Sequence, residues 1–187
     1  MTLSVPWTII DHFLAHLRFS EVIKNIPKNA TVLDLGCGDG KLLFRIKDHI
    51  YRGVGIDLKA PNRKIGKIRL IKVDIEKKIP VKDNSFDVVL AIALIEHLKR
   101  PSPIFNKIYR ILKKNGKLIL TTPTPRSRFL LEFMAFKLGL IAKEEIRGHT
   151  HYWNRSELVQ FLKKKGFRKI AHSYFQFGFN QIIIAKK

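Results

Sequence analysis

The chain has 187 residues, of which 45% are hydrophobic, and its 36 Lys and Arg residues against 15 Asp and Glu residues leave a net charge of +21. This length suits one domain with a proper core and is short for two, so we expect residues 1–187 to form a single domain. The one cysteine, Cys37, excludes an intrachain disulfide framework, and the lack of CxxC pairs or Cys/His zinc spacing predicts no metal site.

Hydrophobic periodicity predicts an alternation of helices and strands along the chain. We expect residues 1–27 to form an N-terminal helical segment, with one helix or two short ones over 11–26, and the apolar stretch 129–141 to be helical as well. Further helices are expected over 41–49, 103–113 and 154–166, and strands over 30–35, 53–57, 68–74, 86–92, 117–122, 167–174 and 179–185. This alternation predicts an α/β fold with a mostly parallel sheet covered by helices on both faces.

The stretch VLDLGCGDG places three glycines on alternate residues between the first predicted strand and the helix that follows it. Glycines in such a turn let the backbone approach a nucleotide-type ligand closely. The next strand ends in GVGID, where the carboxylate of Asp57 can accept both hydrogen bonds from a ribose diol. A dinucleotide would need G-x-G-x-x-G, but Lys41 stands at the third glycine position, and Asp39 places a negative charge where a pyrophosphate would sit.

The spacing G-x-G-x-G, preceded by the acidic Asp34, resembles the class I S-adenosylmethionine-dependent methyltransferases. The chain is similar to the small single-domain, methyltransferase type 11-like members that act on small molecules and lipids. The matching segments are VLDLGCGDG, GVGIDL, VDIEKKIPVKDNSFDVVLAIALIEHL, GKLILTTPTP and HYWNRSELVQFLKKKGF. The resemblance implies S-adenosyl-L-methionine as the cofactor. It also implies a Rossmann-like seven-stranded sheet of order 3-2-1-4-5-7-6, with the last strand antiparallel and helices on both faces.

The resemblance further implies a cofactor site at the carboxyl ends of the first four strands. Its residues are Asp34, Gly36, Cys37, Gly38, Gly40, Asp57, Leu58, Asp74, Ile75, Ala91 and Ala93. The glycine loop would face the methionine moiety, with Asp34 ordering the loop from a buried position. The strand end at Asp57 would bind the ribose, and Asp74 the adenine. The small size of Cys37 explains its place in the loop, and we expect no nucleophilic thiol there.

Methyl transfer from a sulfonium needs alignment and a dry pocket, and it needs a base only if the acceptor keeps its proton at neutral pH. Three histidines are the candidates for such a base or for a substrate contact. His97 follows the fourth main strand, while His149 and His151 precede the last helix. Each could instead have a capping or packing role, and two histidines at i and i+2 without a third ligand make a poor metal site.

Residues 123–150 interrupt the alternation, at the position where the family usually carries a substrate lid. The apolar segment FLLEFMAFKLGLI is flanked there by basic residues. This pattern suits a lid over a hydrophobic acceptor or an amphipathic helix at an anionic membrane, and the alternative is a helix packed on the sheet or in a homodimer.

No secretory leader and no run of about 18 apolar residues occurs, so we expect a cytoplasmic protein, with peripheral membrane contact left open. The charge of +21 would attract RNA or an anionic lipid surface, unless it forms only a solvated surface. We therefore expect a methyltransferase acting on a small-molecule or lipid-like acceptor. The alternatives are an RNA- or protein-directed methyltransferase and a non-catalytic, cofactor-binding partner subunit.

Overall fold

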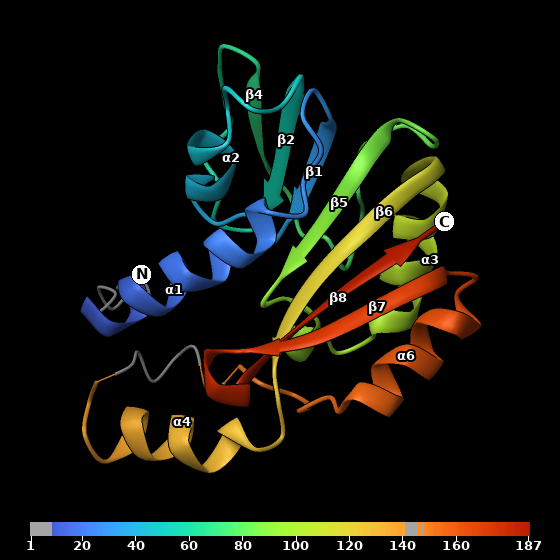
Figure 1. Ribbon diagram of the computed structural model, residues 1–187. Helices are drawn as coiled ribbons and strands as arrows, with labels where there is room; N and C mark the ends of the chain where they lie inside the picture. Colours follow the sequence, from blue (N-terminus) through green and yellow to red (C-terminus); the bar gives the residue numbers. More distant parts are fainter. Residues whose placement is uncertain (1–8, 141–145, 147) are drawn as a thin grey trace.

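The computed structural model describes residues 9–140, 146 and 148–187 and contains one eight-stranded sheet (Figure 1). The strands are β1 (Thr31–Leu35), β2 (Arg52–Asp57), β3 (Arg63–Ile65), β4 (Ile68–Lys72), β5 (Phe86–Ile92), β6 (Leu112–Pro123), β7 (Arg168–Phe175) and β8 (Asn180–Lys186). The helices are α1 (Ile9–Ile23), α2 (Lys41–Arg45), α3 (Pro101–Ile111), α4 (Ser127–Phe136) and α6 (Arg155–Lys164), with the 3-10 helices η1 (Ile95–His97) and η2 (Gln176–Gly178).

The sheet order is β3-β4-β2-β1-β5-β6-β8-β7. With β3 set aside, this is the expected order 3-2-1-4-5-7-6, and β8 runs antiparallel to both β6 and β7 as expected. The pairs from β4 through β2, β1 and β5 to β6 are parallel. The chain reverses its direction of winding between β1 and β5, so a ligand crevice is expected at the carboxyl ends of these strands.

The sheet has eight strands rather than the seven expected, because β3 pairs antiparallel with the outer edge of β4. The two strands form a hairpin in which Ile65 lies opposite Ile68, and Gly66 turns the chain with φ +55°. Three residues are too few to show a strand period, and all three are exposed. Sequence periodicity therefore missed β3.

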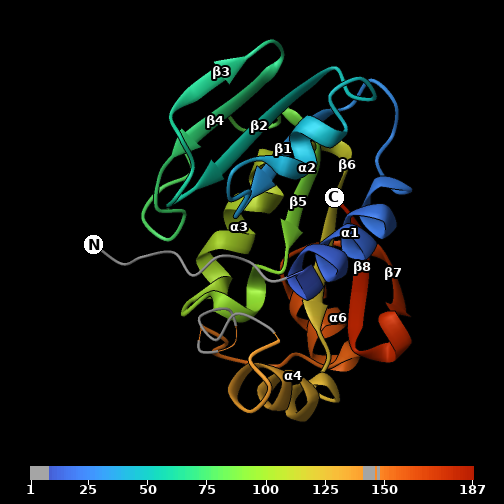
Figure 2. The same cartoon turned by 90° about the vertical axis from the view of Figure 1, so that its left-hand side faces the viewer.

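Helices cover both faces of the sheet (Figure 2). One face of the sheet is covered by α1 and α2. Val22 of α1, Ile26 shortly after that helix, and Leu43 of α2 pack there with Val32 of β1 and Leu90 of β5. The core of the opposite face contains residues of α3 and α6, among them Phe105, Ile108, Leu158 and Leu162, packed on the alternate residues of the same strands. Strands β1 and β5 are consequently buried on both sides, which explains their nearly continuous apolar sequences.

Several element ends differ from those predicted. Helix α2 stops at Arg45 instead of residue 49, and α3 starts earlier, with Pro101 in its first turn, where the missing N–H of proline costs no helical hydrogen bond. The last helix begins as expected after Asn154, whose side chain accepts a hydrogen bond from the N–H of Glu157 in a capping box.

Helix α4 lies at one end of the molecule, beyond the sheet, and packs against α1 (Figure 1). The buried Ala135 and Ile146 form a small separate core with Leu14 of α1 and with Leu131 and Met134 of α4. Part of the expected apolar helix, from residue 141 on, lies outside the described residues. Among the residues that are described, no helix is long and apolar enough to cross a membrane.

Candidate functional site

The loop from Gly36 to Gly40 lies against the end of β2. The N–H groups of Gly36 and Cys37 donate to the carbonyl of Ile56 at 2.8 and 3.4 Å, and the N–H of Gly38 donates to Oδ2 of Asp57 at 3.0 Å. The loop approaches this closely because Gly55 has no side chain: a Cβ there would lie 2.6 Å from Sγ of Cys37. The structure therefore brings together the glycine loop and the carboxylate that sequence analysis assigned to one site.

Gly38 is the loop residue with free space in front of it. Its φ is +54°, a conformation that L side chains rarely adopt, and a Cβ built on it would meet no atom within 4 Å. Gly40 has φ +86°, but a Cβ there would lie 2.8 Å from Leu70. Gly38 thus presents bare backbone to an open space, as a close-lying ligand requires, whereas Gly40 serves packing.

Asp57 lies half-buried at the carboxyl end of β2. Besides the bond from Gly38, its Oδ1 accepts a hydrogen bond from the N–H of Lys59 at 2.7 Å. A carboxylate has about four acceptor positions, so both oxygens can still accept a hydroxyl donor each. Leu58 follows with its side chain 62% exposed.

Asp74 is adjacent to Asp57 at the end of the neighbouring strand. The N–H of Val73 donates to the carbonyl of Asp57 at 3.0 Å, and Oδ1 of Asp74 accepts the N–H of Glu76 at 3.0 Å. Ile75 is partly buried against the core. The two carboxylates expected to bind ribose and adenine therefore lie on adjacent strand ends.

Ala93 lies directly after β5, at the carboxyl end of the strand that pairs with β1. It has φ +49° although it is not glycine, and its N–H donates to the carbonyl of Thr121 at 3.0 Å and to Oγ1 of the same residue at 3.2 Å. Strained backbone of this kind is held in place by its surroundings and occurs often at functional sites. Ala91 is fully buried in β5. Leu94, which follows Ala93, lies over the glycine loop, since a Cβ on Gly36 would be 3.0 Å from its side chain.

The buried Asp34 and the partly buried Cys37 of the loop are held in their neutral forms. Burial, reinforced by the nearby charge of Asp57, raises the pKa of Asp34 to about 8. Burial, and then the charges of Asp34 and Asp57, also raises the pKa of the Cys37 thiol far above its ordinary value. Cys37 therefore stays a protonated thiol at neutral pH, which argues against a nucleophilic role.

The structure brings His97 and His149 together although they are far apart in the chain. Their ring centroids are 4.9 Å apart, and Nδ1 of His149 lies 3.0 Å from the hydroxyl of Tyr152. Burial, followed by the effects of His97 and Arg18, lowers the pKa of His149 to about 4. His149 is therefore neutral at physiological pH and retains a ring nitrogen that can accept a proton.

The buried Glu96 anchors this cluster. Its Oε2 accepts the hydroxyl of Thr122 at 2.9 Å, its Oε1 has no hydrogen-bond partner, and burial raises its pKa. Its carbonyl accepts the N–H and the hydroxyl of Thr150 at 2.6 and 2.9 Å, which holds the segment containing His149 against η1. One potential ligand atom from each of Glu96, His97 and His149 lies within 4.8 Å of the others. Sequence spacing gave no sign of this group, and the expectation that the chain has no metal site stays a prediction.

His151 is placed differently from the other two histidines. It is exposed, its Nε2 lies 3.3 Å from Oε2 of Glu157 in the capping box, and its ring contacts that of Trp153. A cavity of about 360 Å³ nevertheless includes both His149 and His151. It is lined by Pro125, Arg128, Glu132, Ile146, His149, Thr150, His151 and Tyr152.

The neutral Asp34 predicts a pH dependence of stability. Its pKa rises from 3.8 in the unfolded chain to about 8, so the stability it contributes is complete below pH 3.8 and is lost as the pH rises towards 8. We expect the free energy of unfolding to fall by up to about 1.4 kcal/mol per pH unit between pH 6.5 and 8. Asp34→Asn removes this slope in urea unfolding.

The window above pH 6.5 isolates Asp34 from His149. The lowered pKa of His149 makes stability fall only as the pH drops from 6.5 towards 4. The exposed Asp48 provides a control, and Asp48→Asn should keep the wild-type slope. A slope that persists in Asp34→Asn would show that this carboxyl is ionised in the folded protein.

Comparison with known proteins identifies the family. The family described as "Methyltransferase domain" matches residues 8–172. An uncharacterised protein of Methanocaldococcus jannaschii is 41% identical over 170 residues, covering 88% of this chain and 68% of the relative. The ubiquinone biosynthesis O-methyltransferase of Idiomarina loihiensis is 26% identical over 157 residues, covering 75% of this chain and 62% of the relative.

A solved structure shares the fold. A chain in the complex between the Haloferax volcanii Trm112 methyltransferase activator and a methyltransferase has a TM-score of 0.73 at 17% identity, covering 91% of this chain and 89% of that chain. This likeness shows the fold, while the family match extends over most of the sequence. The chain belongs to the methyltransferase domain family and is an S-adenosylmethionine-dependent methyltransferase.

Proposed function

We propose that the protein transfers a methyl group from S-adenosylmethionine to a small-molecule or lipid-like acceptor, whose reacting end enters the cavity between α4 and His149. The observation that carries this proposal is the composition of α4. Its residues Arg128 and Glu132 line the cavity, whereas Phe129, Phe133 and Phe136 are exposed. One helix thus combines a polar cavity wall with an aromatic outer edge, and an acceptor with a polar head and an apolar tail matches both.

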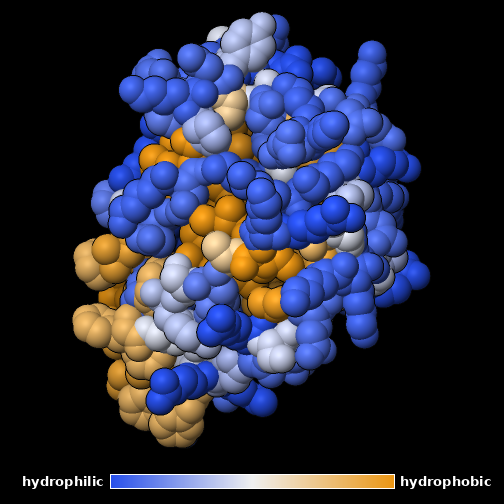
Figure 3. All heavy atoms as spheres, turned by 45° about the vertical axis from the view of Figure 1, so that its right-hand side comes forward, coloured by the Kyte–Doolittle hydropathy of each residue, from blue (hydrophilic) through white to orange (hydrophobic). Residues whose placement is uncertain are grey.

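The apolar edge of α4 is the support for a lipid-like acceptor. Phe129 is 81% exposed and stacks on Phe133 with a centroid distance of 6.4 Å. Figure 3 shows hydrophobic side chains at the lower left of the molecule, where α4 lies, and a further band of them across the middle of this face, with hydrophilic side chains around both. Residues 123–150 would act as the substrate lid. The relative from Idiomarina loihiensis, named for ubiquinone biosynthesis, agrees with a hydrophobic acceptor.

The crevice at the strand ends provides the cofactor site of this proposal. S-adenosylmethionine supplies the methyl group as a sulfonium. The open space at Gly38 would accommodate its methionine part, Asp57 would accept hydrogen bonds from the ribose hydroxyls, and Asp74 would bind the adenine. Gly36, Cys37, Leu58, Ile75, Ala91 and Ala93 would complete the contacts, with Asp34 and Gly40 supporting the loop.

His149 is the residue that we assign to the acceptor. It lines the cavity and is neutral at physiological pH. Its ring also contacts that of His97 in η1, and η1 directly follows Leu94, whose side chain lies over the glycine loop. A hydroxyl acceptor that keeps its proton until transfer would give it to this neutral imidazole, whose pKa of about 4 makes it a weaker base than one with a pKa near neutral pH. His97 would position the ring of His149, and His151 would lie at the cavity wall.

The role of Gly38 can be tested against a matched glycine. Gly38 and Gly66 have φ values of +54° and +55°, and a Cβ on either would meet no atom within 4 Å. Alanine at either position should cost about 1–2 kcal/mol of backbone strain. We expect only Gly38→Ala to weaken S-adenosylhomocysteine binding, by tenfold or more in isothermal titration. Equal affinities of the two variants would remove Gly38 from the site.

The acceptor class can be tested with a pair of probes that differ only in the tail. We expect the protein to transfer a labelled methyl group to a catechol bearing a farnesyl chain at least tenfold faster than to the same catechol without it. The apolar edge of α4 would bind the farnesyl chain by the hydrophobic effect, which contributes a binding free energy of roughly 25 cal/mol per Å² of apolar surface removed from water. The double variant Phe129→Ala, Phe133→Ala should lose the preference for the farnesylated catechol.

The same assay contains its controls. His149→Asn should lower transfer to the farnesylated catechol about 100-fold with unchanged S-adenosylhomocysteine affinity, since a general base contributes about 10²–10⁴-fold. His16→Asn, on the exposed surface of α1, should leave both quantities unchanged. Equal rates with the two catechols, in protein that binds the cofactor, would contradict a lipid-like acceptor.

A further inference from the structure

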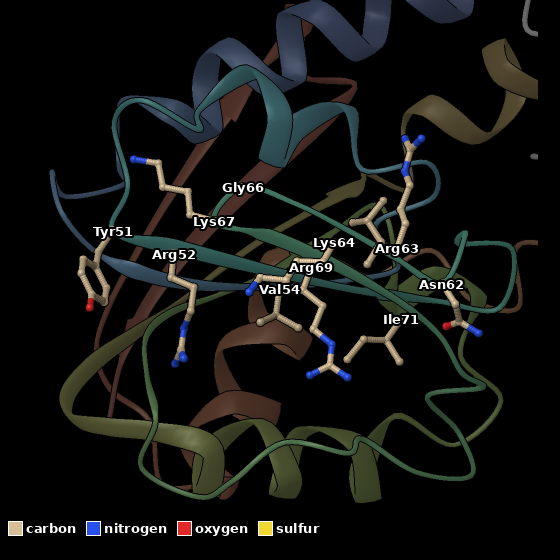
Figure 4. Close-up of a pocket in the computed structure, with 11 residues that line it drawn as sticks. Tyr51, Arg52, Val54, Asn62, Arg63, Lys64, Gly66, Lys67, Arg69 and Ile71 are labelled. Atoms are coloured by element: carbon tan, nitrogen blue, oxygen red, sulfur yellow. The ribbon is translucent and has the colours of Figure 1, made fainter.

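A second and larger cavity lies at the other end of the molecule, along the β2–β4–β3 edge of the sheet. Its volume is about 870 Å³, and none of its residues belongs to the proposed cofactor site or to the cavity beside α4. It is lined by Tyr51, Arg52, Val54, Asn62, Arg63, Lys64, Gly66, Lys67, Arg69, Leu70 and Ile71 (Figure 4). We call this cavity the basic groove.

The basic groove exists because one face of the sheet edge has no helix over it. The connection from β4 to β5, residues 73–85, forms turns and bends, whereas β5 and β6 are connected through α3. Figure 4 shows Arg52, Val54, Arg69 and Ile71 extending from the same side of the sheet into this uncovered space. An edge that a crossover helix would have buried is thus left open to solvent.

Strand pairing places the cations in rows. Arg69 pairs with Val54 on one side and with Lys64 of β3 on the other, so the three side chains cross the sheet side by side. Arg52 lies two residues before Val54 and therefore on the same face. Adjacent strands are about 4.8 Å apart, so these positive charges are close neighbours.

The cations of the groove are not neutralised by the protein. The lining contains five of them and no carboxylate, and no ion pair within the described part of the chain includes any of the five. Lys67 donates to the carbonyl of Ile50 at 2.8 Å, and Arg63 lies over the ring of Phe44 at 5.5 Å, so neither finds an anion. A cleft lined by one sign of charge concentrates the electrostatic potential and attracts an oppositely charged partner.

The uncharged residues of the lining favour a nucleic acid over an anionic membrane as the partner. The partly buried Ile71 lies beside the cations, the buried Val54 forms the floor between them, and Tyr51 at the rim has 68% of its surface exposed, whereas Leu70 is buried towards the opposite face. Grooves that bind single-stranded nucleic acid combine cations for the phosphates with apolar or aromatic surfaces on which bases stack. A membrane would instead need cations around protruding apolar side chains, and this surface is recessed.

We infer that the basic groove binds a single-stranded segment of RNA or DNA, with phosphates on Arg52, Lys64 and Arg69 and a base on Tyr51. This inference goes beyond the proposed function, because the groove and the acceptor cavity share no residue. Nucleic acid bound there need not be the methyl acceptor. The five cations of the groove would then give a function to part of the net charge of +21.

The test is fluorescence anisotropy of labelled 20-nucleotide oligouridylate and oligothymidylate, titrated with the full chain at 50 to 300 mM KCl. We expect the triple variant Arg52→Gln, Lys64→Gln, Arg69→Gln to weaken binding at 100 mM KCl at least tenfold. The slope of log affinity against log salt should fall by about 2, since each phosphate contact to a single strand contributes roughly 0.7. Tyr51→Ala should weaken binding about tenfold without changing the slope.

A triple variant with the same loss of charge is the control. Lys28→Gln, Lys114→Gln, Lys163→Gln removes three exposed cations outside the groove and should change affinity less than threefold. Thermal unfolding confirms that both triple variants are folded, and comparison of the two oligonucleotides separates RNA from DNA. Equal losses in the two triple variants, no binding by the wild type, or groove-dependent binding to phosphatidylglycerol vesicles in place of oligonucleotides would each overturn the inference. None of these readouts depends on methyl transfer.

Discussion

The contact of the glycine loop with the end of β2 is the constraint on which the proposed site depends. Gly55 leaves room for Cys37, and the loop then lies close enough for Gly38 to donate to Asp57. This one packing arrangement fixes the carboxylate, exposes the backbone of Gly38 and buries Asp34 beneath them. A methyl transfer that relies on alignment needs such a rigid frame, because the cofactor brings the reactive group itself.

The connections between the strands determine which parts of the sheet are buried and which form open surfaces. Where a connection contains a helix, as with α3 and α6, the sheet face is buried and contributes stability. Where it does not, between β4 and β5, a basic surface remains open. The connection between β6 and β7 is longer and contains, before α6, helix α4 and the segment that Thr150 holds to Glu96. The same sheet therefore carries the proposed cofactor site, the proposed acceptor cavity and the basic groove at separate places.

Most of the fold could be predicted from periodicity and motif, because β1 and β5 are continuous apolar strands and Asn154 begins a helix with a capping box. The glycine loop and Asp57 are close in the chain, so their meeting was also predictable. The cluster of Glu96, His97 and His149 was not, because it depends on long-range hydrogen bonds from Thr150. The basic groove was not predicted because periodicity missed β3, whose pairing with β4 places Lys64 beside Arg69.

Isothermal titration with S-adenosylhomocysteine tests the central claim most directly. The account predicts micromolar binding by the wild type and, for Asp57→Ala, a loss of about tenfold or more, since a hydrogen bond to a charged group contributes about 1.5–3 kcal/mol. Asp48→Ala, which removes an exposed carboxylate outside the crevice, should bind like the wild type. Absence of binding by folded wild-type protein, or equal affinities of wild type and Asp57→Ala, would contradict the assignment of this crevice as the cofactor site.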